Sequence, residues 1–320
     1  NIFVFYFIYI LFLLNNRYNL TMINKETIYL YILERISNNE KKISKSVANT
    51  FKINQNTAHD FIKQLIEKNI IVREKRDVYK IVNKETKFNF NFPFGEETFL
   101  FYKYIKPLIS GLNENVLKIW EYTFTEMVNN VIDHSKGTRL EILVQQNYLN
   151  TSIIISDNGV GIFKNIQKFF NLPSLEDAIN ELFKGKVTTR SENHSGEGIF
   201  FSSQIMDKFY VCSSNRIFTR TKLNDDTILP SSNKKGTLVL MNLSNWSRKN
   251  LTDIFNRYSN IEDGFYKTDI RDREAIEGTV LNATKINGNS YGYNLKTSTT
   301  STKPVLRSFT ESRRMDRNHK

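Results

Sequence analysis

The stretch SDNGVGIF at residues 156–163 joins an isoleucine-rich run to two closely spaced glycines. The run predicts a β-strand, and Asp157 stands where that strand ends. A carboxylate at this place can accept a hydrogen bond from an exocyclic amine, such as the amino group of adenine. Gly159 and Gly161 permit positive φ angles and a close approach of the backbone to a flat ligand, and Ile162 can cover a ring face. A plain surface turn is the alternative, but such a turn would not need an apolar residue at Ile162.

A long helix is predicted over residues 115–134, and it carries a polar pair. Glu126 and Asn130 are four residues apart, so they lie one helical turn from each other. Such a face usually contacts solvent, but here valines and an isoleucine flank the pair. Asp133 and His134 continue the helix. His134 could approach a ligand bound at Asn130, although a lone histidine is as often a helix cap.

A second glycine pair, Gly196 and Gly198, precedes the apolar pattern IFFSSQIMDKF, so we expect a helix to begin there. Free backbone N–H groups and the positive end of the helix dipole favour a triphosphate. Glu197 is unfavourable beside phosphates unless it points away or faces a metal. The polar stretch FKGKVTTRSENHSGEG at residues 183–198 contains Lys186 and predicts a lid that closes over the phosphates, with a solvated loop as the alternative.

These features together resemble the GHKL ATPase superfamily, which includes gyrase, histidine kinases and anti-sigma-factor kinases. The motifs are ExxxN at Glu126 and Asn130, DNGVGI at residues 157–162, SGEGIF at residues 195–200, and GT at Gly236 and Thr237. Each motif is weak alone. Their order and spacing fit one domain over about residues 96–245.

The resemblance implies that this domain binds ATP with Mg²⁺. It implies that Asn130 holds the metal together with phosphates and waters, and that Glu126 orients or deprotonates the attacking water. The expected nucleotide-binding residues are Asn130, Asp133, Asp157, Gly159, Gly161, Ile162, Lys186, Gly196, Gly198 and Thr237.

Residues 22–90 follow the element order of a winged helix-turn-helix, which is helix, helix, turn, helix and hairpin. Such a unit would place its third helix in a DNA major groove. The candidate DNA-binding residues are Asn54, Gln55, Asn56, Thr57, Lys63, Lys75 and Arg76. A winged helix that mediates protein contacts or dimerisation is the alternative.

The two ends of the chain differ in composition from the rest. Residues 1–21 contain an apolar run that is shorter than the roughly 20 residues of a membrane-spanning helix. We expect a non-native or disordered extension there, with a membrane anchor as the minority alternative. Residues 261–320 are rich in Asn, Thr, Ser and Arg, which predicts a poorly ordered basic tail or a truncated STAS-like segment. Residues 84–95 are expected to be a connecting strand or a linker.

The overall composition is that of a soluble globular protein, with 40% hydrophobic and 24% charged residues among 320. The formal charge of +12 favours an acidic partner such as nucleic acid or nucleotide. A single cysteine, Cys212, excludes an internal disulfide and a cysteine-based zinc cluster, and it fits a reducing cytoplasm.

We therefore expect an α+β protein in which a winged helix precedes a GHKL domain at residues 91–260, with helices on one face of a mixed sheet. The first functional hypothesis is a cytoplasmic bacterial regulator that binds and slowly hydrolyses Mg-ATP, and whose nucleotide state modulates DNA binding. The alternative is a protein kinase of the histidine-kinase or anti-sigma-factor-kinase type that phosphorylates a partner. An inactive relic and a homodimer are further possibilities that the sequence leaves open.

Overall fold

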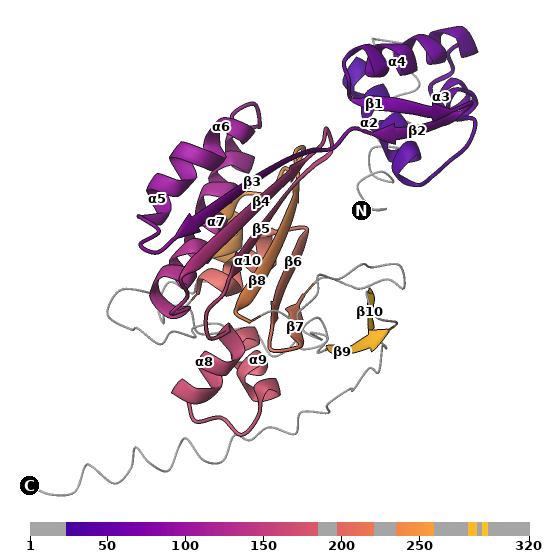
Figure 1. Ribbon diagram of the computed structural model, residues 1–320. Helices are drawn as coiled ribbons and strands as arrows, with labels where there is room; N and C mark the ends of the chain where they lie inside the picture. Colours follow the sequence, from indigo (N-terminus) through magenta and orange to yellow (C-terminus); the bar gives the residue numbers. More distant parts are fainter. Residues whose placement is uncertain (1–23, 185–196, 221–234, 259–280, 287–289, 294–320) are drawn as a thin grey trace, which may run out of the picture.

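The structure is a computed structural model that describes residues 24–184, 197–220, 235–258, 281–286 and 290–293 (Figure 1). The predicted extension at residues 1–21 lies outside the described residues. None of the helices in the described part combines the length and the apolar character that crossing a membrane requires.

The N-terminal unit consists of three helices and a two-stranded antiparallel hairpin, in the order that the sequence predicted. The elements are α2 (Lys25–Ser37), α3 (Ile43–Phe51), α4 (Gln55–Glu67), β1 (Ile71–Lys75) and β2 (Val78–Ile81). Each helix buries one face in a core of its own, which contains Ile32, Leu33, Val47, Leu65 and Ile71. The unit lies at one end of the molecule, beyond the long sheet (Figure 1).

The second unit is built on an eight-stranded sheet, with the strand order β10-β9-β7-β6-β8-β5-β4-β3. The strands are β3 (Lys84–Asn91), β4 (Arg139–Gln146), β5 (Asn150–Asp157), β6 (Lys208–Ser213), β7 (Arg216–Thr219), β8 (Thr237–Ser244), β9 (Leu281–Ile286) and β10 (Ser290–Tyr293). Every described pair of neighbours is antiparallel, so the expectation of a mixed sheet is wrong. The reason is that β8 inserts between β5 and β6, which keeps these two parallel strands from pairing with each other.

Two segments belong to this sheet although their composition suggested otherwise. β3 pairs with β4 along its whole length, so most of the expected linker, and the end of the expected winged-helix unit, is the edge strand of the larger sheet. In the C-terminal segment, β9 pairs with β7 and with β10. The expectation of a poorly ordered tail is therefore wrong for these two strands, because backbone hydrogen bonds to a sheet edge do not depend on an apolar composition.

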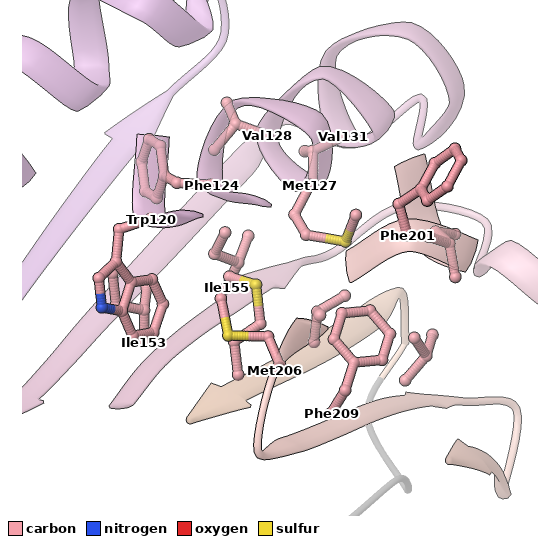
Figure 2. Packing of buried hydrophobic residues seen from close by; sticks show 14 of the residues in the cluster. Trp120, Phe124, Met127, Val128, Val131, Ile153, Ile155, Phe201, Met206 and Phe209 are labelled. Atoms are coloured by element: carbon pink, nitrogen blue, oxygen red, sulfur yellow. The ribbon is translucent and has the colours of Figure 1, made fainter. Parts of the chain in front are cut away.

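Most helices of this unit lie on one face of the sheet, and α8 (Ile162–Phe169) and α9 (Leu175–Lys184) lie at one end of it (Figure 1). The others are α5 (Glu97–Leu100), the π-helical turn η1 (Phe101–Ile105), α6 (Lys106–Ile109), α7 (Glu114–His134), α10 (Gly198–Ile205) and α11 (Leu251–Tyr258). The main core lies between α7, α10 and the sheet. Figure 2 shows Trp120 and Met127 of α7 in one cluster of buried side chains with Ile153 and Ile155 of β5.

Candidate functional site

Asp157 is the last residue of β5, and its side chain is buried. Burial alternates along β5, so the side chain of Asp157 lies on the same face as Ile153 and Ile155. Its Oδ1 accepts a hydrogen bond from the backbone N–H of Gly159 at 2.7 Å, and its Oδ2 accepts one from Thr237 at 3.3 Å. Burial raises the pKa of the Asp157 carboxyl, against the opposing effect of these hydrogen bonds. A carboxylate is thus fixed in a mostly apolar setting.

The start of β8 holds this carboxylate in place. Gly236 has a φ of +100°, and a Cβ at this position would overlap the backbone carbonyl of Asp157. The next residue, Thr237, accepts a hydrogen bond at its Oγ1 from the backbone N–H of Ile162 at 2.9 Å. The Gly-Thr pair therefore joins the end of β5 to the start of α8, and only glycine fits its first position.

The opposite side of the site is the polar face of α7. Glu126, Asn130 and Asp133 lie at helical spacing, and all three line the same pocket. The rest of α7 packs into the core through the buried residues Val116, Ile119, Trp120, Thr123, Phe124, Met127, Val128 and Val131. The apolar face fixes the helix against the sheet, so the polar face is held toward Asp157.

The first turn of α10 approaches α7 at the same place. A Cβ on Gly198 would overlap the side-chain carboxylate of Glu126, so any larger residue here would displace that carboxylate. Burial raises the pKa of Tyr122, and the negative charges of Glu126 and Glu197 raise it further. Glu197 therefore lies close enough to Tyr122 to act on it, and it is not among the residues that line the pocket.

One pocket brings together most of the predicted residues. Its lining includes Glu126, Asn130, Asp133, Asp157, Gly161, Ile162, Gly198 and Thr237. Lys186 and Gly196, and with them nearly all of the expected lid, lie outside the described residues. The positive φ expected at Gly161 is observed, at +85°.

Gly159 is the exception among the predicted residues. Its φ is not positive, and it does not line the pocket. A Cβ on Gly159 would overlap the backbone of Ser135, and the neighbouring Val160 donates its N–H to the Ser135 carbonyl at 2.8 Å. The structure thus packs Gly159 against the end of α7, and its approach to a ligand stays a prediction.

Apart from Ile162, no sequence motif indicated the apolar wall of the pocket. Further lining residues are Met127, Asn129, Val131, Ser135, Ile155, Asn165, Ile166, Leu182, Ile199 and Val239, and His134 also lines it. Strand alternation carried a signal for two of them. Ile155 lies two residues before Asp157, and Val239 lies two residues after Thr237, so each shares a strand face with a predicted residue.

The donor set fits a nucleotide that brings its own metal. Among the described residues, no cluster of three or more His, Cys, Asp or Glu side chains could hold a metal ion alone. Mg²⁺ bound mainly by phosphates and waters needs only one or two protein oxygens, and the Asn130 side chain offers one. The buried Asp157 carboxylate among apolar side chains suits a flat ring with an amino group.

Comparison with known proteins agrees with this geometry. Residues 118–244 match the family model described as "Histidine kinase-, DNA gyrase B-, and HSP90-like ATPase". This segment is a GHKL-type domain. The match runs from α7 to the end of β8, so it contains Glu126, Asp157 and Thr237, and it supports ATP binding by the domain. A search among curated proteins finds no match to the chain.

The candidate DNA-binding residues lie outside the GHKL-type domain, in the N-terminal unit. Asn54 caps α4, since its Oδ1 accepts the backbone N–H of Thr57 at 2.7 Å. Lys63 is exposed and lies 3.7 Å from Glu67. The exposed candidates are Asn54, Gln55, Asn56, Lys63, Lys75 and Arg76, while Thr57 is half-buried. The helix-cap contact means that Asn54 has a structural role whatever the unit binds.

Proposed function

We propose that the pocket of the GHKL-type domain binds Mg-ATP and slowly hydrolyses it, and that the nucleotide state controls DNA binding by the N-terminal unit as a winged helix. The observation that carries the nucleotide part is the buried Asp157 carboxylate. It is held by two backbone N–H groups at one end of a pocket whose other end presents the polar face of α7.

Asp157 would select the base. Two backbone N–H groups use part of the acceptor capacity of the carboxylate, which has about four lone-pair positions. The remaining capacity suits the exocyclic amine of adenine. Guanine presents a carbonyl at the corresponding ring position, and a carbonyl facing a carboxylate leaves two acceptors unpaired. Ile162 and Val239, which line the pocket, would contact the ring faces.

The polar face of α7 would act on the phosphates. Asn130 would supply a side-chain oxygen to Mg²⁺, and the metal would neutralise phosphate charge. Glu126 would orient the attacking water and accept its proton. The contact between Gly198 and Glu126 supports this role, because it holds the carboxylate beside the first turn of α10, where free backbone N–H groups favour phosphate.

Thermal unfolding tests the nucleotide part directly. We expect Mg-ATP to raise the melting temperature, Mg-GTP to have little effect, and the Asp157→Asn variant to respond to neither. A ligand at 100 times its Kd stabilises a folded protein by about 2.7 kcal/mol, which is readily measured. Equal stabilisation by both nucleotides, or none by ATP, would contradict the proposal.

A DNA-retention measurement tests the regulatory part. Labelled double-stranded DNA is titrated with the full chain in the presence of Mg-ATP, Mg-ADP or no nucleotide. We expect the DNA affinity to change with the nucleotide. DNA binding that is the same in all three conditions would leave the nucleotide part standing and overturn its regulatory link to DNA.

A further inference from the structure

The segment that forms α3 and its two flanking residues is basic, and no acidic residue lies within it. The segment KKISKSVANTFK at residues 41–52 contains four lysines and no acidic residue. Lys45 and Asn49 lie one turn apart on the helix, and Lys42 and Lys52 are the residues that flank it at its two ends. All four are exposed, and the opposite face is buried in the core.

These lysines have no counter-charge in the part of the chain that the structure describes. No ion pair involves Lys42, Lys45 or Lys52 there. On α4, Lys63 pairs with Glu67. On the hairpin, Lys80 pairs with Glu74. Arg73, Lys75 and Arg76 form no ion pair among the described residues, but they alternate in sequence with Glu74 and Asp77, whereas no acid interrupts residues 41–52. The segment of α3 therefore carries positive charge without an acidic residue in its sequence, which favours an anionic partner.

The backbone conformation at the two ends of α3 is unusual for lysine. Lys42 and Lys52 flank α3 with φ angles of 60° and 54°, in the left-handed region that favours glycine and asparagine. Of the other non-glycine positions of this kind in the described chain, four carry asparagine (Asn39, Asn69, Asn171 and Asn215), and the rest are Asp77, Ser214 and a third lysine, Lys136. Lysine at both ends of α3 is a less stable choice for the fold, and such outliers cluster at functional sites.

The basic face adjoins the start of α4. Lys52 lies two residues before Asn54, the N-cap of α4. Gln55 donates its side-chain N–H to the hydroxyl of Ser44 at 3.4 Å, so the first turns of the two helices touch. A duplex that contacts the start of α4 would therefore bring its phosphates near α3.

We propose that the lysine face of α3, formed by Lys42, Lys45 and Lys52, binds the phosphate backbone of double-stranded DNA. This inference rests on the DNA part of the proposed function and assigns the electrostatic contact to residues outside the candidate set on α4 and the hairpin. The contact is independent of base sequence, because phosphates carry no sequence information.

The experiment compares two triple variants of the full chain. The test variant is Lys42→Asn, Lys45→Gln and Lys52→Asn. Asparagine tolerates the left-handed positions, so this variant should unfold at the same temperature as the wild type or higher. The control variant, Lys84→Gln, Lys118→Gln and Lys208→Gln, removes the same charge from exposed lysines of the second unit. The probe is a labelled random-sequence duplex, titrated at several salt concentrations.

For the test variant we expect DNA affinity to fall about tenfold or more at low salt. The slope of log K against log salt should become shallower by about 2 to 3, since each phosphate contact contributes about 0.9. The control variant should keep nearly the full slope. Equal slopes for the wild type and the test variant, with DNA still bound, would overturn the assignment of the phosphate contact to α3 and leave the DNA part of the proposed function standing.

Two further outcomes separate this inference from the function on which it rests. Absence of any DNA binding by the wild type would overturn both. Retention of the wild type, but not of the test variant, on vesicles of phosphatidylcholine and phosphatidylserine, without binding to DNA, would assign the lysine face to a membrane surface and overturn the DNA proposal.

Discussion

At the scale of single residues, Asp157 combines burial with a negative charge. Its carboxyl lies on the core-facing side of β5 and accepts two backbone N–H groups. The hydrogen bonds lower its pKa, but burial has the larger effect and raises it. An ionised Asp157 therefore destabilises the empty domain at neutral pH, and a ligand that donates a hydrogen bond to it offsets part of that cost.

This balance predicts a pH-dependent difference between the wild type and Asp157→Asn. A raised pKa means that the folded state takes up the proton more readily than the unfolded state. The stabilisation from protonation is complete below the ordinary value of 3.8 and is lost as pH rises through the raised pKa. As the pH falls from about 7 to about 4, we expect the free energy of unfolding of the wild type to rise relative to that of the variant. Urea unfolding at a series of pH values measures this, and a constant difference would contradict it.

Glu126 carries the second residue-scale prediction. Replacing it by Gln keeps the size of the side chain that packs on Gly198 but removes the base. We expect ATP affinity to stay within a few-fold of the wild type and the hydrolysis rate to fall by about 10²- to 10⁴-fold. Single-turnover hydrolysis with labelled ATP measures the rate. Glu121→Gln is the matched control, because Glu121 lies five residues earlier on α7 and accepts a hydrogen bond from Tyr102, and this variant should hydrolyse ATP normally. A similar rate in all three proteins would assign the proton acceptor elsewhere.

At the scale of elements, the site depends on how closely segments far apart in sequence approach each other. Glycines make two of these approaches possible: Gly236 between β8 and β5, and Gly198 between α10 and α7. The two differ in what a side chain would meet. At Gly236 it would meet backbone atoms and a positive φ, whereas at Gly198 it would meet the end of a flexible side chain.

The junction of β5 and β8 gives an element-scale prediction. Gly236→Ala places a Cβ against the backbone of Asp157 at a φ of +100°, so we expect a loss of about 2 to 4 kcal/mol in free energy of unfolding. Gly111→Ala is the control, because nothing lies within 4 Å of its Cβ position, and it should change stability by less than about 0.5 kcal/mol. Urea unfolding of both variants tests this. Equal stabilities would show that the junction relaxes without cost.

How much of the site could be predicted varies from element to element. The polar face of α7 and the acid at the end of β5 were predictable, because helix and strand periods fix which residues share a face. The pairing of β8 between β5 and β6 was not, since long-range strand order leaves no periodic signal in either strand. The packing of Gly159 against Ser135 was not predictable for the same reason, because it is a tertiary contact.

At the scale of the whole molecule, the N-terminal unit and the sheet have separate cores that meet at one turn. Tyr148 and Leu149, between β4 and β5, pack against the N-terminal core. Trp246 supports this turn through a hydrogen bond from its Nε1 to the Tyr148 carbonyl at 3.0 Å. Since β5 and β8 run between this turn and Asp157 and Thr237, the same two strands connect the pocket to the turn that contacts the N-terminal core.

This arrangement predicts a selective effect of Tyr148→Ala. Removing the ring takes apolar contact from the N-terminal core but leaves the pocket intact. We therefore expect the free energy that protects the amides of helices α2 to α4 from hydrogen exchange to fall by about 1 kcal/mol. Hydrogen exchange measured by mass spectrometry reports this loss, and ATP affinity should not change. Tyr102→Ala, at an exposed tyrosine away from the turn, is the control. Unchanged exchange in the N-terminal helices of Tyr148→Ala would show that the turn does not stabilise that unit.

The sequence by itself determined the two-unit order, the long helix with Glu126 and Asn130, and the acid and glycines that follow a core strand. Local periodicity and turn chemistry are short-range properties, and each segment carries them alone. Only the tertiary structure decided that the sheet is antiparallel, that β3 and β9 belong to it, and which apolar residues wall the pocket. These features depend on which segments meet in space, because pairing and packing energies arise between segments that no local pattern connects.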